Sequence, residues 1–278
     1  SSKLIAPSTF KFVPLSSSIR EGNPLVFMVD PHVHSVFRSL EDFEALSVAG
    51  VTDIVSVAFY PVTPSSPATL IDHFRHILEA EPERFSGLPI KVHSAVGIHP
   101  RCIPGDVKPV FEYMAEVVDR CVAVGEIGLE TASDLETEVL ERQLRLCKEK
   151  DVPAIVHTPR KNKKPVTDKI INVVKRVGYY NIMIDHVNIE NIELVESLDV
   201  HIGLTVQRGK LNPETLLQII EQYVTKNPEK FLLDTDLGRE PSDLFSLPKA
   251  VQFLRVKGID RETIELISSK NASSLLKL

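Results

Sequence analysis

The sequence is poor in the residues that mark several common protein classes. Its 278 residues include no tryptophan, five tyrosines and three cysteines. The cysteines, Cys102, Cys121 and Cys147, are scattered and form no Cys-x-x-Cys pair, which argues against a disulfide framework and a zinc ribbon. No apolar run approaches the roughly 20 residues that span a bilayer, and residues 1–23 lack a hydrophobic signal core. We therefore expect a soluble, cytoplasmic protein that does not associate with a membrane.

Positive charge is also in short supply. The chain has 32 Lys and Arg against 38 Asp and Glu, which gives a net charge of −6 and a pI near 5.9. Domains that coat nucleic acid usually have a pI above about 9, so this class is disfavoured, although a local basic patch is compatible with these numbers. The scarcity of Trp and Tyr also leaves no aromatic-rich platform on which the bases of a single strand could stack.

From Pro24 onward, short β-branched runs alternate with longer amphipathic runs, which is typical of βα units. We expect strands near residues 24–30, 51–59, 91–98, 121–126, 152–157, 181–186, 199–204 and 230–235. We expect helices near residues 39–48, 68–80, 107–119, 134–150, 166–177, 189–197, 213–224 and 244–257, with an extra C-terminal helix at 261–276. This pattern predicts a single (β/α)8 TIM-type barrel over residues 24–278, after a short N-terminal extension at residues 1–23. A doubly wound open sheet is disfavoured because no glycine turn follows the first strand.

The carboxyl ends of the expected strands carry candidate metal ligands. The first strand leads into Asp30-Pro31-His32-Val33-His34, and side chains two apart on a strand share a face, so His32 and His34 form a bidentate clip. Six of the eight ends carry His, Glu or Asp, and the further ones are His99, Glu126, His157, Asp185 with His186, and Asp234 with Asp236. Each alone has an ordinary explanation as a polar residue or a helix cap. Together at one barrel mouth they would be costly to bury unless a cation neutralised them.

The remaining histidines fail this test. His73 and His76 are three apart on an expected helix, so we expect both to be solvated. His93 and His201 lie near the beginnings of strands, at the opposite end of the barrel from the chemistry.

The order of these motifs resembles the TatD-like branch of the metal-dependent amidohydrolases over almost all of the chain after Pro24. The most specific motif is Gly125-Glu126-Ile127-Gly128-Leu129, and the others are His32-Val33-His34, Gly97-Ile98-His99-Pro100, His157-Thr158-Pro159-Arg160, Asp185-His186, Gly203-Leu204-Thr205 and Asp234-Thr235-Asp236. The resemblance implies a hydrolase with a binuclear centre of two divalent metal ions. Glu126 would bridge the ions, His32, His34 and Asp236 would complete one shell, and His157 and His186 the other. Zinc, manganese and magnesium all stay open, although four histidines lean away from magnesium.

The implied chemistry is hydrolysis by a metal-bound hydroxide, because two cations about 3.5–4 Å apart can activate a water and polarise the scissile ester. Asp236 can take the proton of the attacking water and pass it to the leaving group, so Glu126 and Asp236 are the expected catalytic residues. Asp236 is preferred to Asp234 because it stands where the strand-eight acid of the family stands. Asp30 is assigned a place behind the ligands, where it accepts a ring N–H or closes the barrel floor.

Departures from the family pattern fall on loops that would contact the substrate. Glu130 stands where the family has Asp, Thr158 and Pro159 separate His157 from Arg160, and Asp236 runs into Leu-Gly-Arg. We read the chain as a divergent member of the group.

Basic residues gather on the loops at the catalytic end, which predicts an anionic, phosphate-bearing substrate, DNA included. The expected substrate-binding residues are His99, Arg160, Lys161, Lys164 and Arg208, and further basic residues nearby are Arg101, Lys163, Lys210 and Arg239. The resemblance points to a phosphodiesterase or deoxyribonuclease. Solvated loop charge is the simpler explanation of the basic residues.

Three other functions stay open. They are a hydrolase of a small amide, lactone or phosphoester, a histidinol-phosphatase-like phosphoesterase, and a non-catalytic metal-binding barrel. The second would ordinarily show an Asp-x-His pair near the C-terminus, where this chain has Asp-Thr-Asp. The number of subunits is left open by the sequence.

Overall fold

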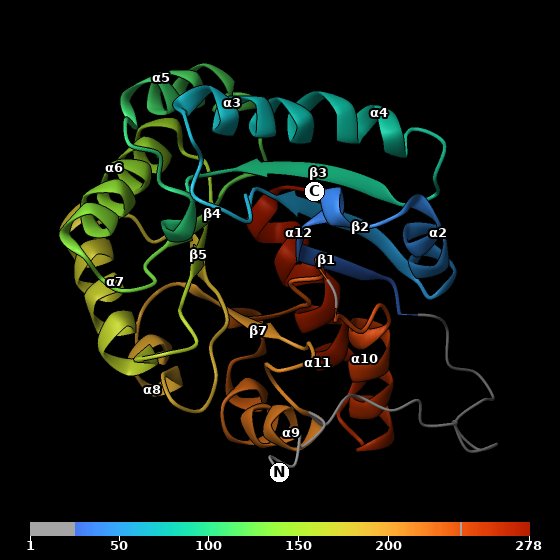
Figure 1. Cartoon of the computed structure of the whole chain (residues 1–278). Helices are drawn as coiled ribbons and strands as arrows, with labels where there is room; N and C mark the ends of the chain where they lie inside the picture. Colours follow the sequence, from blue (N-terminus) through green and yellow to red (C-terminus); the bar gives the residue numbers. More distant parts are fainter. Residues whose placement is uncertain (1–25, 240) are drawn as a thin grey trace, which may run out of the picture.

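The computed structural model describes residues 26–239 and 241–278 (Figure 1). Eight parallel strands follow one another around a barrel in the order in which they occur in the sequence. They are β1 (Met28–Val33), β2 (Val51–Val57), β3 (Lys91–Val96), β4 (Ala123–Gly128), β5 (Ala154–His157), β6 (Ile182–Ile184), β7 (His201–Thr205) and β8 (Phe231–Asp234). The predicted (β/α)8 barrel is confirmed, while the expected N-terminal extension, residues 1–23, lies outside the described residues.

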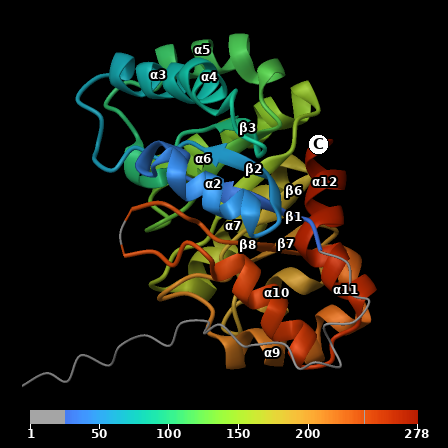
Figure 2. The ribbon, with the colours of Figure 1, turned by 90° about the vertical axis from the view of Figure 1, so that its right-hand side faces the viewer.

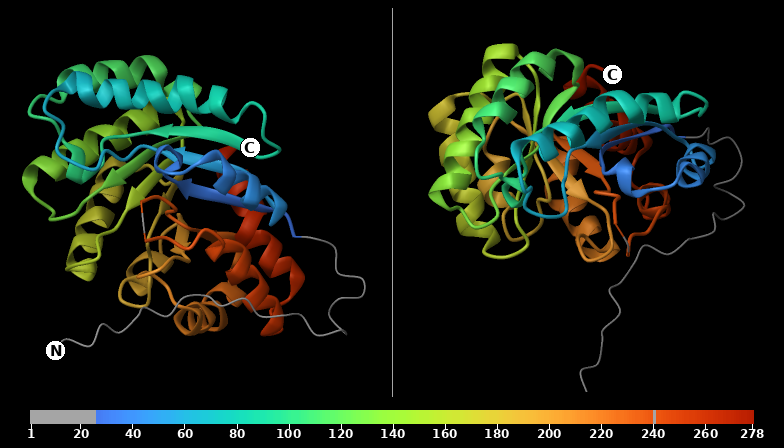
Figure 3. Two further views of the ribbon diagram at one scale, coloured as in Figure 1. Left: turned by 45° about the vertical axis from the view of Figure 1, so that its right-hand side comes forward. Right: turned by 45° about the horizontal axis from the view of Figure 1, so that its top comes forward.

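Helices surround the strands. They are α2 (Leu40–Val48), α3 (Pro67–Arg75), α4 (Glu81–Phe85), α5 (Lys108–Val117), α6 (Asp134–Lys150), α7 (Lys163–Val177), α8 (Ile192–Glu196), α9 (Pro213–Gln222), α10 (Ser246–Val256), α11 (Arg261–Glu265) and α12 (Asn271–Leu276). Short helical turns lie between them: η1 (Ser35–Phe37), η2 (His76–Ala80), η3 (Pro100–Cys102), η4 (Val118–Arg120), η5 (Val224–Lys226), η6 (Pro228–Lys230) and η7 (Leu266–Lys270). Helices α3, α4 and α5 cover the β3 side of the barrel, and α6 and α7 lie beside β4 and β5 (Figure 3). Of the described helices, none is long and apolar enough to reach across a bilayer.

Several helix ends follow from the local sequence. The Ser133 hydroxyl accepts the N–H of Glu136 at the start of α6, which makes it the N-cap. Asn212 caps α9 in the same way, with Pro213 at the first helical position. Gly178 ends α7 with a φ of 66°, a left-handed conformation that glycine adopts without a steric penalty.

The barrel is filled by one apolar layer and closed at its lower end by the last helix. The layer consists of Val29, Val55, Val57, Ala95, Ala123, Ile155, Met183 and Leu232. Ala272, Leu275 and Leu276 of α12 pack against it. Five of its members are the first or second residues of their strands, namely Val29, Ala123, Ile155, Met183 and Leu232, and α12 covers these amino ends (Figure 2). The opposite end of the barrel is therefore left for chemistry.

The barrel closes between β1 and β8 with few main-chain links among the described residues. Val33 bridges Leu237, and the N–H of His34 donates to the Leu237 carbonyl over 2.7 Å. The carboxylate of Asp30 reaches across to β8 and accepts hydrogen bonds from the Thr235 N–H (3.1 Å) and hydroxyl (2.5 Å). Asp30 thus joins the two strands, and the interpretation that it accepts a ring N–H from a ligand histidine is wrong.

The prediction for the outer histidines is only partly correct. His93 and His201 lie near the starts of β3 and β7, as expected. His76 is half exposed, as expected. The prediction that His73 is solvated is wrong, because His73 is only 9% exposed. His73 shares a face of α3 with the buried Leu70, and its ring packs 5.7 Å from that of Tyr60. Burial lowers the pKa of His73 to about 4.

Candidate metal centre

A pocket of about 1060 Å³ opens at the carboxyl ends of the strands. Five of the six residues predicted to bind metal line it, namely His34, Glu126, His157, His186 and Asp236, and His32 lies fully buried against Glu126. The structure therefore brings together all six of these side chains from strand ends that are up to two hundred residues apart in the sequence.

Glu126 lies at the middle of the cluster, and its two oxygens face different histidines. Oε2 lies 3.5 Å from His32 Nε2 and 3.6 Å from His34 Nε2. Oε1 lies 2.9 Å from His157 Nδ1 and 3.2 Å from His186 Nε2. The four histidines thus lie in two pairs, one at each oxygen of Glu126, and these are the pairs that the resemblance implies as ligands of separate ions.

Asp236 completes the first of these groups. Its Oδ1 lies 2.9 Å from His34 Nε2 and 3.8 Å from His32 Nε2. Both Asp236 and His186 have a positive φ, 47° and 58°, a left-handed conformation that non-glycine residues rarely adopt. Such conformations gather at functional sites, where surrounding contacts hold them. The backbone turn at Asp236, beyond the end of β8, aims this side chain at His34, whereas Asp234 remains inside the barrel.

Each of the four histidines has one ring nitrogen turned outward to an oxygen. His34 Nδ1 donates to the Val57 carbonyl (2.9 Å), and His32 Nδ1 donates to the Asp185 carboxylate (2.5 Å). The corresponding pairs on the other side of Glu126 are His157 Nε2 with Glu130 (2.9 Å) and His186 Nδ1 with the Thr205 hydroxyl (2.7 Å). An acceptor on the outer nitrogen holds the proton there, so the inner nitrogen presents a lone pair toward Glu126.

Two of these inner nitrogens test whether the residues fit a metal. His32 Nε2 and His157 Nδ1 are buried and form no hydrogen bond of acceptable geometry within the described part of the chain, although Glu126 oxygens lie 3.5 and 2.9 Å from them. Buried polar atoms are almost always partnered, and an orphaned one calls for an explanation. Imidazole lone pairs and carboxylate oxygens that converge in this way are the donors that zinc and manganese accept, so the site fits a divalent cation.

The charges of the cluster depend on one another. Burial raises the pKa of Glu126, but the charge of the neighbouring His32 ring and the hydrogen bonds of His157 and His186 outweigh it and hold this pKa well below its ordinary value. Burial similarly opposes the ionisation of Asp236, and Lys210 together with His34 pulls its pKa well below the usual range. Both carboxylates are therefore ionised and available as ligands at neutral pH.

His99 has the opposite arrangement. Its Nδ1 accepts the backbone N–H of Arg101 over 3.0 Å, so the proton of the neutral ring lies on Nε2, which points toward Glu126 Oε1 at 3.8 Å. Burial lowers the pKa of His99 to about 3, so the ring stays neutral. An N–H in this position is a hydrogen-bond donor and no metal ligand, which is compatible with the predicted substrate contact.

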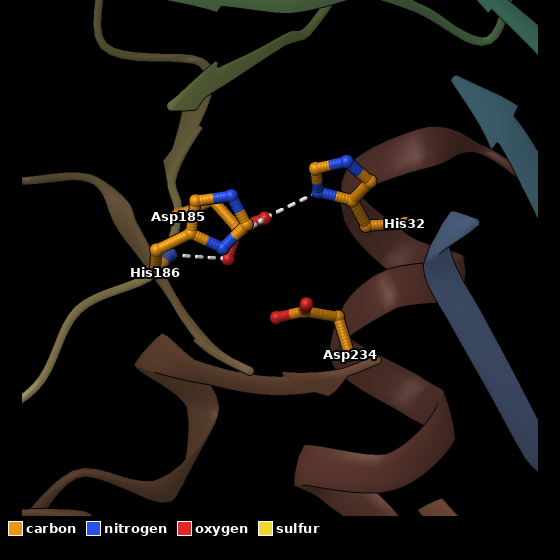
Figure 4. Close-up of side chains that lie close together, drawn as sticks. All are labelled: His32, Asp185, His186 and Asp234. Atoms are coloured by element: carbon orange, nitrogen blue, oxygen red, sulfur yellow. Dashed lines mark hydrogen bonds and ion pairs between the residues drawn. The ribbon is translucent and has the colours of Figure 1, made fainter. Parts of the chain in front are cut away.

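Asp185 and Asp234 lie beneath the cluster; from the sequence both were counted among the strand-end candidates, but neither was assigned to one of the two sets of ligands. Figure 4 shows the Asp185 carboxylate joined to His32 and to the His186 backbone N–H, with the Asp234 carboxyl pointing toward the same space. Burial opposes the charge of Asp185, but His186 and His32 outweigh it and lower its pKa. Burial, and then the charge of Asp185, raises the pKa of Asp234 well above its ordinary value. The two shifts are opposite in direction, which favours the negative charge on Asp185 and the neutral form of Asp234.

Glycine at position 203 makes room for Asp185. A β-carbon there would lie 2.3 Å from Asp185 Oδ1, closer than two such atoms can approach. The motif Gly203-Leu204-Thr205 therefore serves the site twice, since Thr205 also accepts the ring N–H of His186.

The basic residues of the mouth divide into two groups. Arg160 and Arg208 line the pocket as predicted, whereas Lys161 and Lys164 are exposed and are not among its lining residues. Lys163 is buried and donates to the Thr158 hydroxyl (3.0 Å) and the His186 carbonyl (2.7 Å), so it supports the loop after β5.

Lys210 makes contacts that the sequence did not reveal. Its ammonium contacts the Asp236 carboxylate and lies over the ring of His186, 3.3 Å from Nε2 and 3.0 Å from Nδ1. A positive charge thus lies between a side chain from each group of candidate ligands, where it competes with a cation for Asp236.

Phe59 is the last residue of the expected second strand, and it had no role assigned from the sequence. Phe59 lines the pocket, and its ring centroid lies 5.3 Å from that of His34. The signal was present in the alternation along β2, because Val55 and Val57 face the barrel interior and Phe59 is the next residue in that series.

Comparison with known proteins agrees with this geometry. A family model described as "TatD related DNase" matches residues 29–277. A protein of Methanocaldococcus jannaschii named as an uncharacterized metal-dependent hydrolase is 34% identical over 256 residues, which are 90% of this chain and 100% of that protein. The crystal structure of the TatD-like protein of Archaeoglobus fulgidus superposes with a TM-score of 0.76 at 37% identity, covering 90% of this chain and 100% of the other.

A more distant structure shares the fold alone. The phosphotriesterase homology protein of Escherichia coli, solved with phosphate in its active site, has a TM-score of 0.70 at 14% identity, over 90% of this chain and 99% of the other.

Proposed function

This chain belongs to the TatD-related family of metal-dependent hydrolases, and from that premise we propose that it is a phosphodiesterase of the deoxyribonuclease type with a binuclear metal centre. The observation that carries the proposal is the pair of orphaned inner nitrogens, His32 Nε2 and His157 Nδ1, on opposite sides of Glu126. Two buried lone pairs that face the two oxygens of one carboxylate support two cation positions, with Glu126 shared between them.

The proposed ligands are His32, His34 and Asp236 for one cation and His157 and His186 for the other, with Glu126 common to both. Zinc and manganese suit this mixture of nitrogen and oxygen donors better than magnesium does. When bound, the cations would lower the pKa of a water and polarise a phosphoryl oxygen.

The chain's own groups would handle protons and position the substrate. Asp236, ionised and at the pocket surface, can accept a proton at Oδ and return it to the leaving oxygen. His99 would donate its Nε2–H to a phosphoryl oxygen, since its backbone hydrogen bond holds the proton on that atom. Arg160 and Arg208 would attract the phosphate from the mouth.

The size of the pocket supports a substrate larger than a single small ester. Its volume of about 1060 Å³ is at the upper end of the range for small-molecule sites, which is roughly 300–1,000 Å³. A short nucleic-acid strand or its end fits this space better than a lactone or a simple amide.

The test is a comparison of substrate classes. Purified protein is analysed for bound metal and then assayed on phosphodiesters, lactones and amides, with and without a chelator. We expect phosphodiester hydrolysis that the chelator abolishes and that added zinc or manganese restores. Hydrolysis of lactones or amides alone would replace the phosphodiesterase with the small-molecule hydrolase, and bound metal without turnover of any class would indicate a non-catalytic barrel.

A further inference from the structure

One wall of the pocket carries an aromatic ring flanked by two guanidinium groups. Phe59 lies beside the candidate metal ligands, with its ring centroid 5.3 Å from that of His34 and 5.0 Å from that of His99. The guanidinium carbon of Arg101 lies 5.6 Å from the centre of the same ring, and that of Arg239 lies 5.8 Å from it. Both distances are within the range of a cation–π contact.

The two arginines arrive from loops that are far apart in the sequence, and each loop is fixed. Arg101 lies in η3, whose position is set by the hydrogen bond from its own N–H to His99 and by the contact of the Cys102 thiol with the Tyr60 carbonyl. This second contact joins the loop after β3 to the loop that carries Phe59.

Arg239 follows a glycine that passes close to the metal-ligand cluster. A β-carbon at Gly238 would lie 3.2 Å from His34 Cδ2, a tight contact that would require a shift of a few tenths of an ångström. Glycine lets the chain pass directly beside His34 and bring the next side chain, Arg239, onto Phe59. The Leu-Gly-Arg sequence after Asp236, a departure from the family pattern, therefore has a structural consequence at the pocket wall.

Neither guanidinium of this wall forms an ion pair with a described residue, although the carboxylate of Glu130 lies in the same pocket. No described carboxylate lies within 4.0 Å of the guanidinium of Arg101 or Arg239, whereas the nearby Arg38 and Arg84 each contact an acid. Both arginines line the pocket, so an anion that enters it beside Phe59 is attracted by two positive charges. Guanidinium groups bind phosphate oxygens in pairs of charge-assisted hydrogen bonds, which makes phosphate the best-matched anion.

We propose that Phe59, Arg101 and Arg239 form a second phosphate subsite, which holds the phosphate one linkage away from the phosphodiester being cleaved. The proposal rests on the proposed function and specifies its substrate class. The preferred substrate is an oligonucleotide or another molecule with at least two phosphates in sequence, and an isolated diester uses only the metal-ligand side of the pocket. Phe59 keeps the two arginines at a fixed place beside His34.

The experiment compares two substrates and two pairs of substitutions in the full chain. The first substrate is bis(p-nitrophenyl) phosphate, which has one phosphodiester. The second is a dinucleotide that carries a terminal phosphate, tested in one form with the phosphate at the 5′ end and in another with it at the 3′ end. The test variant is Arg101→Gln/Arg239→Gln. The control, Arg145→Gln/Arg261→Gln, removes the same charge from exposed positions on α6 and α11 that are not pocket-lining residues.

We expect kcat/KM of the test variant to fall about tenfold to a hundredfold for the phosphorylated dinucleotide, as for the loss of charged hydrogen bonds. Activity on bis(p-nitrophenyl) phosphate should stay within about twofold, and the control should match the wild type on both substrates. An equal loss on both substrates, or no loss on either, would overturn the subsite.

A binding measurement separates this proposal from the proposed function. Calorimetric titration of chelator-treated protein with the phosphorylated dinucleotide and its dephosphorylated form measures the subsite without turnover. If the wild type hydrolyses no phosphodiester, the proposed function fails, and weaker binding of the phosphorylated form by the double variant still supports the subsite. If Phe59→Leu weakens binding of both forms and the arginine variant weakens neither, the ring stacks on a base and the phosphate subsite is wrong.

Discussion

Asp185 accepts a hydrogen bond from the ring of His32, over 2.5 Å between Oδ2 and Nδ1, although 153 positions separate them in the chain. The same carboxylate accepts the backbone N–H of His186 at its other oxygen. One buried acid therefore holds a candidate ligand from each side of Glu126. The orientation of the two sets of ligands depends on a residue that faces away from the pocket.

Asp185→Asn should weaken metal binding without unfolding the barrel. The amide is similar in shape but loses the charge that holds the proton on His32 Nδ1, and losing an acceptor behind a metal-binding histidine typically costs 10- to 100-fold in affinity or activity. Competitive titration with a chelating dye measures the affinity. Circular dichroism checks the fold.

Asp234→Asn is the matched control for this change. Asp234 is buried beside Asp185 and its pKa is raised, so it is already neutral, and an amide should replace it with an effect on metal affinity below about threefold. Equal losses in both variants would mean that any change at this depth disturbs the site, and the role given to Asp185 would be wrong.

Glu126→Gln should abolish hydrolysis and lower the metal content of the purified protein, because Glu126 presents an oxygen to each pair of histidines. An amide offers one oxygen and no charge, so it cannot offset the repulsion between two cations. Elemental analysis and the phosphodiester assay measure the two effects. A variant that keeps its metal and its rate would show that Glu126 is not shared between ions.

Lys210→Ala should increase the affinity for divalent cations. The Lys210 ammonium contacts Asp236 and lies against His186, where it competes with a cation for the same groups. Its removal should tighten binding by about tenfold, the effect of roughly 1.4 kcal/mol. If affinity falls instead, Lys210 stabilises the loaded site and its contact with Asp236 is not competitive.

His73→Phe should make the protein less sensitive to acid. The pKa of His73 is lowered to about 4 in the folded state, from an ordinary value of about 6.5, so the unfolded chain binds the proton more tightly. His73 therefore does not change the free energy of unfolding above pH 6.5. As the pH falls from 6.5 toward 4, His73 lowers this free energy by up to about 3 kcal/mol. His73 Nε2 is buried without a partner among the described residues, so phenylalanine forfeits no hydrogen bond at that atom.

Urea unfolding of the wild type and the His73→Phe variant at pH 5 and at pH 8 tests this prediction. The variant should lose less stability between the two pH values than the wild type does. His76→Gln, three residues along and half exposed, is the control. The same pH dependence in all three proteins would exclude His73 as the group responsible.

The three lysines after β5 should behave differently from one another. Lys163→Ala should lower stability by about 1–3 kcal/mol, since it leaves the buried His186 carbonyl and Thr158 hydroxyl without their donor. Lys161→Ala/Lys164→Ala should leave the free energy of unfolding unchanged, because these side chains are exposed outside the pocket. For the same reason the Michaelis constant should change by no more than about twofold. A large rise in the Michaelis constant of the double variant would restore their predicted role in substrate binding.

The strand-end residues could be located from sequence because of the architecture. In a parallel barrel every strand delivers its last residues to one mouth, so Glu126, His157 and His186 could be placed together by counting βα units. His32 and His34 could also be paired from sequence, because residues two apart on a strand lie on the same face. No side-chain contact had to be known for this step.

The residues behind the ligands could not be found in this way. Asp30 and Asp185 both precede a candidate ligand, and sequence offers no reason to prefer one as the partner of His32. The register of β1 against β2 is irregular between Asp30 and Val33, so the strand period does not carry through this segment. Asp30 turns to Thr235 on β8, and Asp185, from across the barrel, takes the ring N–H.

Helix faces and loops were the other source of error. His73 was expected to be solvated because it lies three residues from the polar His76 on the same helix. Its other neighbours, Leu70 and Phe74, are buried, and His73 lies on their face of α3. Lys163 stands in a run of lysines, and only the fold shows that it turns inward to His186 while Lys161 and Lys164 face solvent.

The narrow join between β1 and β8 has a consequence for how this barrel responds to its ions. The strand that carries His32 and His34 meets the strand that leads to Asp236 through a single main-chain bridge in the described chain, helped by Asp30. A cation held by these three side chains would cross-link the barrel where its hydrogen-bonded ladder is thinnest. Amide hydrogen exchange should therefore slow on metal loading first and most at His34, whose N–H donates to Leu237, and at Leu237 itself, well before any change in the helices outside.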